Sequence, residues 1–264
     1  TRAMQFVAAS KLRRAQDATL ASRPYSDKLD EVLSDVAAVV DHEAHPLLAE
    51  EQEGTRLIVL FTSDRGMAGS LNTNTIRFAM QEITRSEDEL QVVTVGRKGT
   101  AAMRRAHVPL AASFDGYGDR PSFTDILPLA RLIGDDFLAG QYSKVHLLYP
   151  AFVSTLVQRP EVKRLLPVKA NPDSSEGIPG GQFIFEPDPS RVLAELMPRY
   201  VATRLFQAVL ELTASEQSSR MVAMRNATDN AQELIDDLTL TYNKVRQAGI
   251  TNEMIEIATG ASNV

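Results

Sequence analysis

Residues Ala214–Ala261 have the sequence ASEQSSRMVAMRNATDNAQELIDDLTLTYNKVRQAGITNEMIEIATGA, in which no proline interrupts a helix. Together with the residues before them, they predict one long helix over Arg191–Gly260, with Pro198 as its only candidate break. About 60 uninterrupted residues form a rod of roughly 90 Å, whereas a small domain is about 30 Å across. Such a helix cannot fold back into a compact core, so it must pair with another helix, enter a partner, or both.

The second half of this helix carries a heptad pattern. Apolar and small residues recur there at spacings of three and four, which is the pattern of a coiled-coil seam. Its small and polar members make the seam weaker than a Leu/Ile zipper. The predicted seam consists of Ala231, Leu234, Leu238, Thr241, Val245, Ala248, Asn252 and Ile255.

Upstream of the seam, Thr213–Arg220 has no large apolar residue for about two turns. One interpretation is an exposed helix between two packed regions. The other is a close helix–helix approach through small residues, which leaves Arg220 free to meet a partner.

Composition excludes several classes of protein. The 264 residues suffice for one large domain or two modest ones, and the 44% hydrophobic and 23% charged residues are ordinary for a soluble globular protein. A net charge of −6 gives no global basic field of the kind that nucleic-acid binders use. The absence of cysteine excludes disulfides and Cys-based zinc sites, and no apolar run is long enough to span a membrane. The histidine pair His42 and His45 is interpreted as solvated loop before Pro46 rather than as a metal site.

The first segment, Thr1–Gln16 (TRAMQFVAASKLRRAQ), has four basic residues and no acidic one. That composition is typical of a mitochondrial transit peptide. The competing interpretation is a basic amphipathic helix, with Met4, Val7 and Leu12 at helical spacing. Since the chain starts in a helical pattern without an N-cap signal, we interpret it as a helix whose beginning is missing.

Three parts follow from these patterns: a helix and a connection over 1–54, a central α/β domain over 55–189, and the long helix over 190–264. The terminal helices each have an apolar stripe that cannot be buried alone, so we expect them to pack as an antiparallel coiled coil. The connection is Asp41–Gly54, and Asn171–Gly181 is expected to be a mobile loop.

Strand and helix signals alternate in the central part, which predicts a doubly wound, largely parallel α/β domain. The last two predicted strands could pair as a hairpin. The predicted strands are Arg56–Ser63, Gln91–Gly96, Leu110–Phe114, Lys144–Pro150, Phe152–Val157 and Leu165–Val168. The predicted helices are Thr73–Thr84, Gly99–Arg105 and Thr124–Leu138.

One motif suggests an enzyme. Ser63–Asn72 (SDRGMAGSLN) follows a strand and opens a helix, which is the geometry that cradles phosphates. It lacks the Lys-Ser/Thr of a Walker A loop and is not G-x-G-x-x-G, so tight turns and close backbone approach are the favoured roles of its glycines. Gly96–Gly99 is a weaker candidate still, and the adjacent Asp236 and Asp237 point in different directions on a helix. The sequence therefore predicts no catalytic site, cofactor or metal.

The quoted stretch Ala214–Ala261 closely resembles the C-terminal helix of the gamma subunit of F-type ATP synthases. TRAMQFVAASKLRRAQ resembles the N-terminal helix of that family, and SDRGMAGSLN its central-domain signature. The resemblance covers essentially the whole chain, and the two terminal motifs are highly specific. It implies that the first residues of the family's helix are absent here.

The resemblance implies a rotor shaft. In the family, the two terminal helices form an antiparallel coiled coil whose upper part stands inside a hexamer of alpha and beta subunits. The α/β domain sits near the base, beside the epsilon subunit and the c-subunit ring. Rotation driven by proton or sodium flow changes the beta sites in turn, while gamma itself catalyses nothing and is peripheral to the membrane.

The resemblance also assigns contact residues. Arg220, Gln247 and Thr251 match positions that meet the catch loops of the beta subunits, and Met4 matches a position close by. At the base, Phe185, Glu186 and Asp188 match a region near the c ring and epsilon.

Chloroplast members carry an inserted segment with two cysteines, which this chain lacks. We therefore expect the cytoplasmic face of a bacterial inner membrane, with the matrix face of the mitochondrial inner membrane as the alternative. Two rival functions remain at this point: a free-standing nucleotide-binding α/β protein, and a coiled-coil scaffold unrelated to energy conversion.

Overall fold

The computed structural model describes residues 1–39, 54–86, 88–168 and 188–261. Nearly all of the predicted connection Asp41–Gly54 lies outside these residues, including the histidine pair His42 and His45. The predicted loop Asn171–Gly181 and the predicted base residues Phe185 and Glu186 lie outside them as well.

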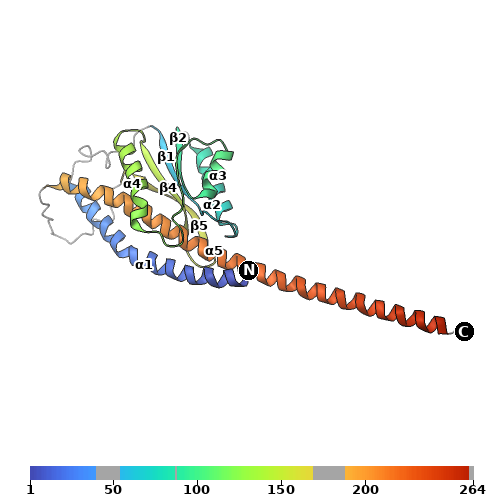
Figure 1. Cartoon of the computed structure of the whole chain (residues 1–264). Helices are drawn as coiled ribbons and strands as arrows, with labels where there is room; N and C mark the ends of the chain where they lie inside the picture. Colours follow the sequence, from blue (N-terminus) through green and yellow to red (C-terminus); the bar gives the residue numbers. More distant parts are fainter. Residues whose placement is uncertain (40–53, 87, 169–187, 262–264) are drawn as a thin grey trace.

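Two helices dominate the molecule. The helix α5 (Pro189–Ala261) is continuous over 73 residues and passes through Pro198 without a break. The helix α1 (Arg2–Val39) has 38 residues and contains Pro24. In Figure 1, the first half of α5 lies against the α/β domain, and the second half leaves it as a bare rod that ends at the C-terminus.

Hydrogen bonds at two levels show that α1 and α5 run antiparallel. Near one end, Thr228 Oγ1 lies 2.9 Å from Thr1 Oγ1. Near the other end, Ser26 Oγ donates to Gln207 Oε1 at 3.1 Å and accepts from Arg204 Nη1 at 3.2 Å. Between these levels α1 buries Ala8, Leu12 and Ala15, so the predicted antiparallel pairing is confirmed for the first half of α5.

The predicted seam in the second half of α5 is not used inside the described chain. Thr1 pairs with Thr228, and the seam begins only after that level. Its large members face solvent: Leu234 and Leu238 are each 59% exposed, and Val245 is 67% exposed. In the described chain the heptad pattern therefore forms an exposed apolar surface of the rod, which the described part of α1 does not cover.

The α/β domain has one five-stranded sheet in the order β3-β2-β1-β4-β5. The first four strands are parallel and β5 runs antiparallel to β4, so the sheet is largely parallel, as predicted. The strands are β1 (Arg56–Phe61), β2 (Leu90–Val95), β3 (Leu110–Phe114), β4 (Lys144–Phe152) and β5 (Gln158–Leu166). The helices are α2 (Leu71–Arg85), α3 (Arg97–Arg105) and α4 (Phe123–Leu138).

The last strand lies elsewhere than predicted. Phe152 ends β4, and the following residues form a tight turn in which the N–H groups of Val153 and Ser154 both donate to the Val157 carbonyl. The sequence of β5, QRPEVKRLL, was missed because it is polar at its start. An edge strand with a solvent-facing side needs no continuous apolar run.

Both faces of the sheet are covered, as a doubly wound domain requires (Figure 1). Successive side chains of a strand point to opposite faces. Accordingly Ile58 and Leu60 pack with residues of α2 and α3, whereas Leu57, Val59 and Phe61 pack with α4, α5 and the end of α1. Each of these five side chains of β1 is at most 1% exposed, so β1 lies at the centre of the domain.

The two halves of α5 should respond differently to the same substitution. Leu205 is fully buried, whereas Leu234 is 59% exposed. Leu205→Ala should lower the free energy of unfolding of the isolated chain by about 2–5 kcal/mol because it leaves a cavity. Leu234→Ala should change it by less than about 0.5 kcal/mol. Urea denaturation of both variants measures this, and equal losses would contradict the placement of the second half of α5 in solvent.

Candidate functional site

The candidate site lies at the carboxyl ends of β1, β2 and β3, where open α/β sheets commonly bind ligands. A cleft of about 200 Å³ opens there. It is lined by the ends of the strands, by residues 116–119 and by α5. Drug-sized ligands usually occupy clefts of about 300–1,000 Å³, so this cleft is small for a nucleotide.

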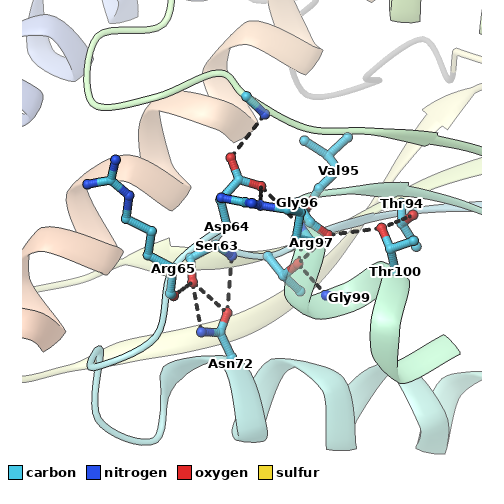
Figure 2. A network of polar contacts seen from close by, with 12 residues as sticks. Ser63, Asp64, Arg65, Asn72, Thr94, Val95, Gly96, Arg97, Gly99 and Thr100 are labelled. Carbon is cyan, nitrogen blue, oxygen red and sulfur yellow. Dashed lines mark hydrogen bonds and ion pairs between the residues drawn. The ribbon is translucent and has the colours of Figure 1, made fainter. Parts of the chain in front are cut away.

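A carboxylate of the protein fills the position where an anion would bind. Asp64 follows β1 and accepts hydrogen bonds from the backbone N–H of Arg97 and of Gly116, both at 3.0 Å (Figure 2). Arg97 is the first residue of α3, and the N-terminus of a helix attracts negative charge. The Asp64 side chain therefore supplies the charge that a phosphate would otherwise bring.

The next backbone N–H groups of α3 are also bonded inside the protein. Lys98 N donates to the Ser63 carbonyl at 3.2 Å, and Gly99 N donates to Thr62 Oγ1 at 2.8 Å. Gly96 has φ +102°, and a Cβ there would lie 1.9 Å from the Thr62 carbonyl oxygen. The glycines of this turn thus allow α3 to approach the end of β1.

In the Ser63–Asn72 motif after β1, polar groups are likewise satisfied by hydrogen bonds within the motif. Ser63 Oγ donates to the Arg65 carbonyl at 2.6 Å, and Asn72 Nδ2 donates to Ser63 Oγ at 2.8 Å (Figure 2). Asn72 Oδ1 accepts from Ser63 N at 3.1 Å. These bonds tie the loop to the start of α2 and explain its polar residues without a ligand.

The polar run Thr213–Arg220 attaches α5 to the α/β domain by hydrogen bonds, and we call this segment the seat. Ser215 Oγ donates to the Pro150 carbonyl at 2.9 Å, Ser218 Oγ to that of Thr155 at 2.6 Å, and Ser219 Oγ to that of Ala68 at 2.6 Å. Both Ser215 and Ser218 are fully buried. The interpretation of this run as an exposed helix is therefore wrong. The small residues do allow close approach, but these serines contact β4 and loops of the α/β domain, whereas the alternative interpretation expected another helix.

Asp119 joins three parts of the fold at this level. Its Oδ1 accepts from Gln217 Nε2 of α5 at 3.0 Å, and its Oδ2 lies 2.5 Å from Lys11 Nζ of α1. Glu211, one turn and a half earlier on α5, accepts from Phe152 N at 2.8 Å. The seat therefore fixes both the position of α5 along the domain and its rotation about its own axis.

Arg220 is not free, contrary to the expectation from sequence. Its Nη2 lies 2.5 Å from Glu216 Oε1 and 3.3 Å from the Gly66 carbonyl oxygen. The Arg220 side chain is only 13% exposed. Burial raises the pKa of Glu216, the neighbouring charge of Arg220 opposes that rise, and Asp119 and Asp64 add to it.

The other predicted contact residues lie apart from this seat. Gln247 and Thr251 are exposed on the rod, and the Thr251 hydroxyl donates to the Gln247 carbonyl at 2.8 Å. They lie roughly 40 Å along the helix from Arg220. Met4 is 49% exposed on the first turns of α1. At the other end of α5, exposed Asp188 accepts from Arg191 N at 2.9 Å and caps the helix.

Sequence reasoning missed Asp64, Asp119 and Glu216. The available signal was their position: Asp64 directly follows a buried strand, and Glu216 stands one turn before Arg220. Across the described ranges, no cluster of His, Asp and Glu is arranged to hold a metal ion. In the same part of the chain, no helix has the length and apolarity needed to cross a membrane.

Comparison with known proteins identifies the family. The ATP synthase family model matches residues 1–264. The chain is 47% identical to the ATP synthase gamma chain of Roseiflexus sp. (strain RS-1), with 99% of this chain and 91% of that relative covered. It is 45% identical to the ATP synthase gamma chain of Dehalococcoides mccartyi (strain CBDB1), with 99% and 92% covered. The chain therefore belongs to the family of ATP synthase gamma chains.

Solved structures share the fold. The central stalk and c-ring structure of the Tetrahymena thermophila mitochondrial ATP synthase aligns with a TM-score of 0.65 at 24% identity, covering 86% of this chain and 98% of that one. A chain of the Euglena gracilis mitochondrial OSCP/F1/c-ring structure aligns with a TM-score of 0.61 at 19% identity, covering 96% and 94%. The long terminal helices and the central sheet thus recur together.

The internal bonding of α3 leads to a prediction about nucleotides. Because Asp64 and the Thr62 hydroxyl already occupy its first N–H groups, the isolated chain should not bind ATP at micromolar concentrations. Isothermal titration calorimetry with Mg-ATP measures this directly. The variant Asp64→Ala tests whether this side chain satisfies the N–H groups at the start of α3. It should lower the free energy of unfolding by about 1–3 kcal/mol, because those N–H groups lose their acceptor. Micromolar binding to the unaltered chain would support the free-standing nucleotide-binding alternative.

Glu216, whose side chain is 15% exposed, leads to a prediction about pH. Because its pKa is raised in the folded chain, the folded state binds more protons than the unfolded state between the two pKa values. As the pH falls through the raised pKa of Glu216 toward the usual pKa of a glutamate, about 4.3, the unaltered chain should therefore become more stable relative to Glu216→Gln, and this difference should reverse as the pH rises again. Glu216→Gln retains an acceptor for Arg220 but does not titrate.

Thermal unfolding of the two chains across this pH range tests the expectation. A difference that stays constant with pH would show that burial does not shift this carboxyl. Glu216→Ala serves as the matched control at neutral pH. It removes the acceptor from a half-buried guanidinium and should cost about 1–3 kcal/mol.

Proposed function

We propose that this chain is the non-catalytic rotor subunit in the central stalk of an F-type ATP synthase. In this role it couples ion-driven rotation of the c-subunit ring to conformational change at the catalytic beta subunits, during ATP synthesis or hydrolysis. The observation that carries the proposal is the bare second half of α5, with exposed Leu234, Val245 and Ile255. A rod of this length with apolar residues on its surface needs a surrounding partner.

The partners in this proposal are the hexamer of alpha and beta subunits around the rod, and the epsilon subunit and c ring at the base. The relatives reported above are named ATP synthase gamma chains, and the similar solved structures come from central-stalk and c-ring assemblies. The proposed location is peripheral, at the cytoplasmic face of a bacterial inner membrane, with the mitochondrial matrix face as the alternative. Both relatives named here are bacterial.

The seat supplies a route for torque in this proposal. Force applied to the α/β domain at the base has to reach the rod through bonds that resist rotation of α5. The serines of the seat and the Asp119 bridge are such bonds, because each hydroxyl or amide must point at one particular oxygen. The antiparallel α1 stiffens the same length of α5.

Contact residues divide into three groups. Gln247 and Thr251 are exposed on the rod and are proposed to meet the catch loops of the beta subunits, with Met4 close to that region. Arg220 is proposed to make such a contact in some rotor positions by sharing or leaving Glu216. Phe185, Glu186 and Asp188 are proposed to face epsilon and the c ring.

Assembly is the first test. The tagged chain should copurify with alpha and beta subunits expressed beside it, and the purified complex should hydrolyse ATP. Retention of these subunits also separates the proposal from a coiled-coil scaffold unrelated to energy conversion. Failure of the chain to assemble with them would overturn the proposed function.

A matched pair of substitutions tests coupling on the rod. Gln247→Ala should leave the stability of the isolated chain within about 0.5 kcal/mol, because the side chain is exposed. It should slow ATP turnover of the assembled complex, because a contact made in only some rotor positions changes the barrier between them. Gln232→Ala is the control, as another exposed glutamine on the same rod that does not match a catch-loop position.

Stopped-flow or steady-state ATPase assays on the two complexes give the comparison. Equal turnover in the Gln247 and Gln232 variants would contradict the coupling role of Gln247. Arg220→Ala is a poorer test, because it also leaves the buried Glu216 without its partner and lowers stability on its own.

A further inference from the structure

A second cleft, of about 290 Å³, lies between α4 and the early part of α5. It shares no lining residue with the cleft at the carboxyl ends of the strands. The two helices contact each other on the same face of the sheet, and Figure 1 shows α4 beside the first half of α5. The proposed rotor function makes no use of this cleft.

The walls of this cleft are apolar and partly built from small residues. Three of the lining side chains carry charge, and every other lining residue is apolar or glycine. A Cβ atom placed on Gly134 in the α4 wall would meet nothing within 4 Å. Glycine inside a helix is less favourable than alanine, so this wall stays open although a side chain would suit the helix better.

The volume of the cleft sets the size of a ligand. An apolar cavity of about 150 Å³ holds a benzene molecule. At about 290 Å³, this cleft has room for roughly twice that volume. A bound water needs two to four polar partners, which apolar walls do not provide. The favoured occupant is therefore an apolar body, because its burial removes apolar surface from water.

The two walls run antiparallel. Phe123, the first residue of α4, packs edge-on against Phe206 of α5, with ring centroids 5.6 Å apart. At the other end of α4, Leu138 lines the cleft together with Met197, which precedes Phe206 in α5. The aromatic pair therefore marks one end of the cleft, and the start of α5 lies toward the other.

Two cations flank the cleft at the same level. Arg131 follows Phe123 by eight residues in α4, and Arg199 precedes Phe206 by seven in α5. Both therefore lie roughly 11 Å along their helices from the aromatic pair. Both side chains are exposed, and neither guanidinium has an ion pair or hydrogen bond with a described residue. Asp135 is the third charged residue of the lining, so the three together leave one positive charge in excess.

We propose that this cleft binds a small amphipathic anion, namely a free carboxylate on an unbranched apolar chain of about eight carbon atoms. The chain would lie between α4 and α5 beside the aromatic pair. The carboxylate would lie at the level of Arg131 and Arg199, since a guanidinium binds a carboxylate through two parallel hydrogen bonds. This site is independent of the proposed rotor function, because all of its residues belong to the chain itself.

Isothermal titration calorimetry of the whole chain measures the affinity for octanoate and for octanol, its uncharged analogue. Octanoate should bind with a Kd below about 1 mM. Octanol should bind at least about fivefold more weakly, because it forms no charge-assisted hydrogen bond. Absence of saturable octanoate binding would overturn the inference, and equal affinities would overturn the choice of an anion.

A pair of double variants tests the role of the cations. Arg131→Gln combined with Arg199→Gln should weaken octanoate binding at least about tenfold and leave octanol binding unchanged. The matched control is Arg104→Gln combined with Arg105→Gln, which removes two exposed cations of α3 that do not line the cleft. It should bind octanoate as the unaltered chain does. Equal weakening in both double variants would indicate attraction by the overall charge and would overturn the site.

Filling the cleft tests its location. Gly134→Leu should fold, because its Cβ meets open space, and it should abolish the binding of both compounds. Gly134→Ala is the matched control and should retain octanoate binding, because one methyl group leaves most of the volume open. Circular dichroism verifies the fold of each variant. Undiminished octanoate binding to folded Gly134→Leu would place the ligand elsewhere and overturn the inference.

Methyl resonances of the unaltered chain locate the ligand without any variant. Octanoate should shift the methyl resonances of Leu127, Leu138 and Val201, which line the cleft. The methyl groups of Leu234 and Val245 on the rod serve as the internal reference and should not shift. Shifts confined to the rod would overturn the inference.

The same titration of the purified complex separates this inference from the proposed function. Octanoate binding to the complex would support the site within the assembly. Loss of binding there would show that another subunit covers the cleft, and it would overturn ligand binding in the assembly. Failure of the chain to copurify with alpha and beta subunits overturns the proposed function and leaves the site on the isolated chain intact.

Discussion

The hydrogen bonds between the serines of α5 and backbone carbonyls of the α/β domain are the contacts on which the rest of the structure depends. Ser215 binds a carbonyl of β4, Ser218 one in the turn after β4, and Ser219 one in the loop after β1. Apolar packing alone would let a long helix slide or turn, because it is not directional. Hydroxyl-to-carbonyl bonds depend on angle as well as distance, so they fix α5 at one height and one rotation. The antiparallel α1 then has a fixed surface to pack against.

At the carboxyl end of the sheet, where open α/β sheets commonly bind ligands, hydrogen bonds within the chain hold the loop after β1 against α3. Asp64 supplies the negative charge at the start of α3, and Thr62 and Ser63 satisfy the next N–H groups. The space above these bonds is bordered by α5, with Thr213 and Glu216 in its wall. Loop, helix N-terminus and long helix therefore stabilise one another where a nucleotide-binding relative of this fold would hold phosphate.

Much of this architecture could be predicted from the sequence, because regular spacing reports burial on one face. The long helix, α1 and the parallel strands follow from such spacing, and β1 is an uninterrupted apolar run. The edge strand β5 was missed because one of its sides faces solvent and its residues look like a loop. The heptad at Leu234 and Leu238 predicts an apolar surface, which the structure shows exposed, but the pattern does not indicate what covers that surface.

Whether polar residues on a helix are buried was harder to predict from the sequence. Serine and arginine in Thr213–Arg220 look the same in sequence whether they meet water or the carbonyls of a loop far away in the chain. Their burial depends on contacts across more than 60 residues, such as Ser215 with Pro150 at a separation of 65. Local pattern carries no information on such pairs. The resemblance to gamma subunits could indicate Arg220 as a contact residue, but it could not indicate that Glu216 already binds it.

One helix thus contains two chemically different halves, and the difference suits the proposed rotor. In the seat, serine hydroxyls of α5 bind oxygens of other parts of the chain. On the rod, the hydroxyls of Thr239, Thr251 and Thr259 donate to carbonyls four residues earlier in α5 itself. Their donors are therefore already used and need no fixed partner in a surrounding sleeve. The proposed shaft has to be bonded firmly at its base and lightly where it turns, and the outward-bonding serines of the first half and the self-bonded threonines of the rod meet these two needs.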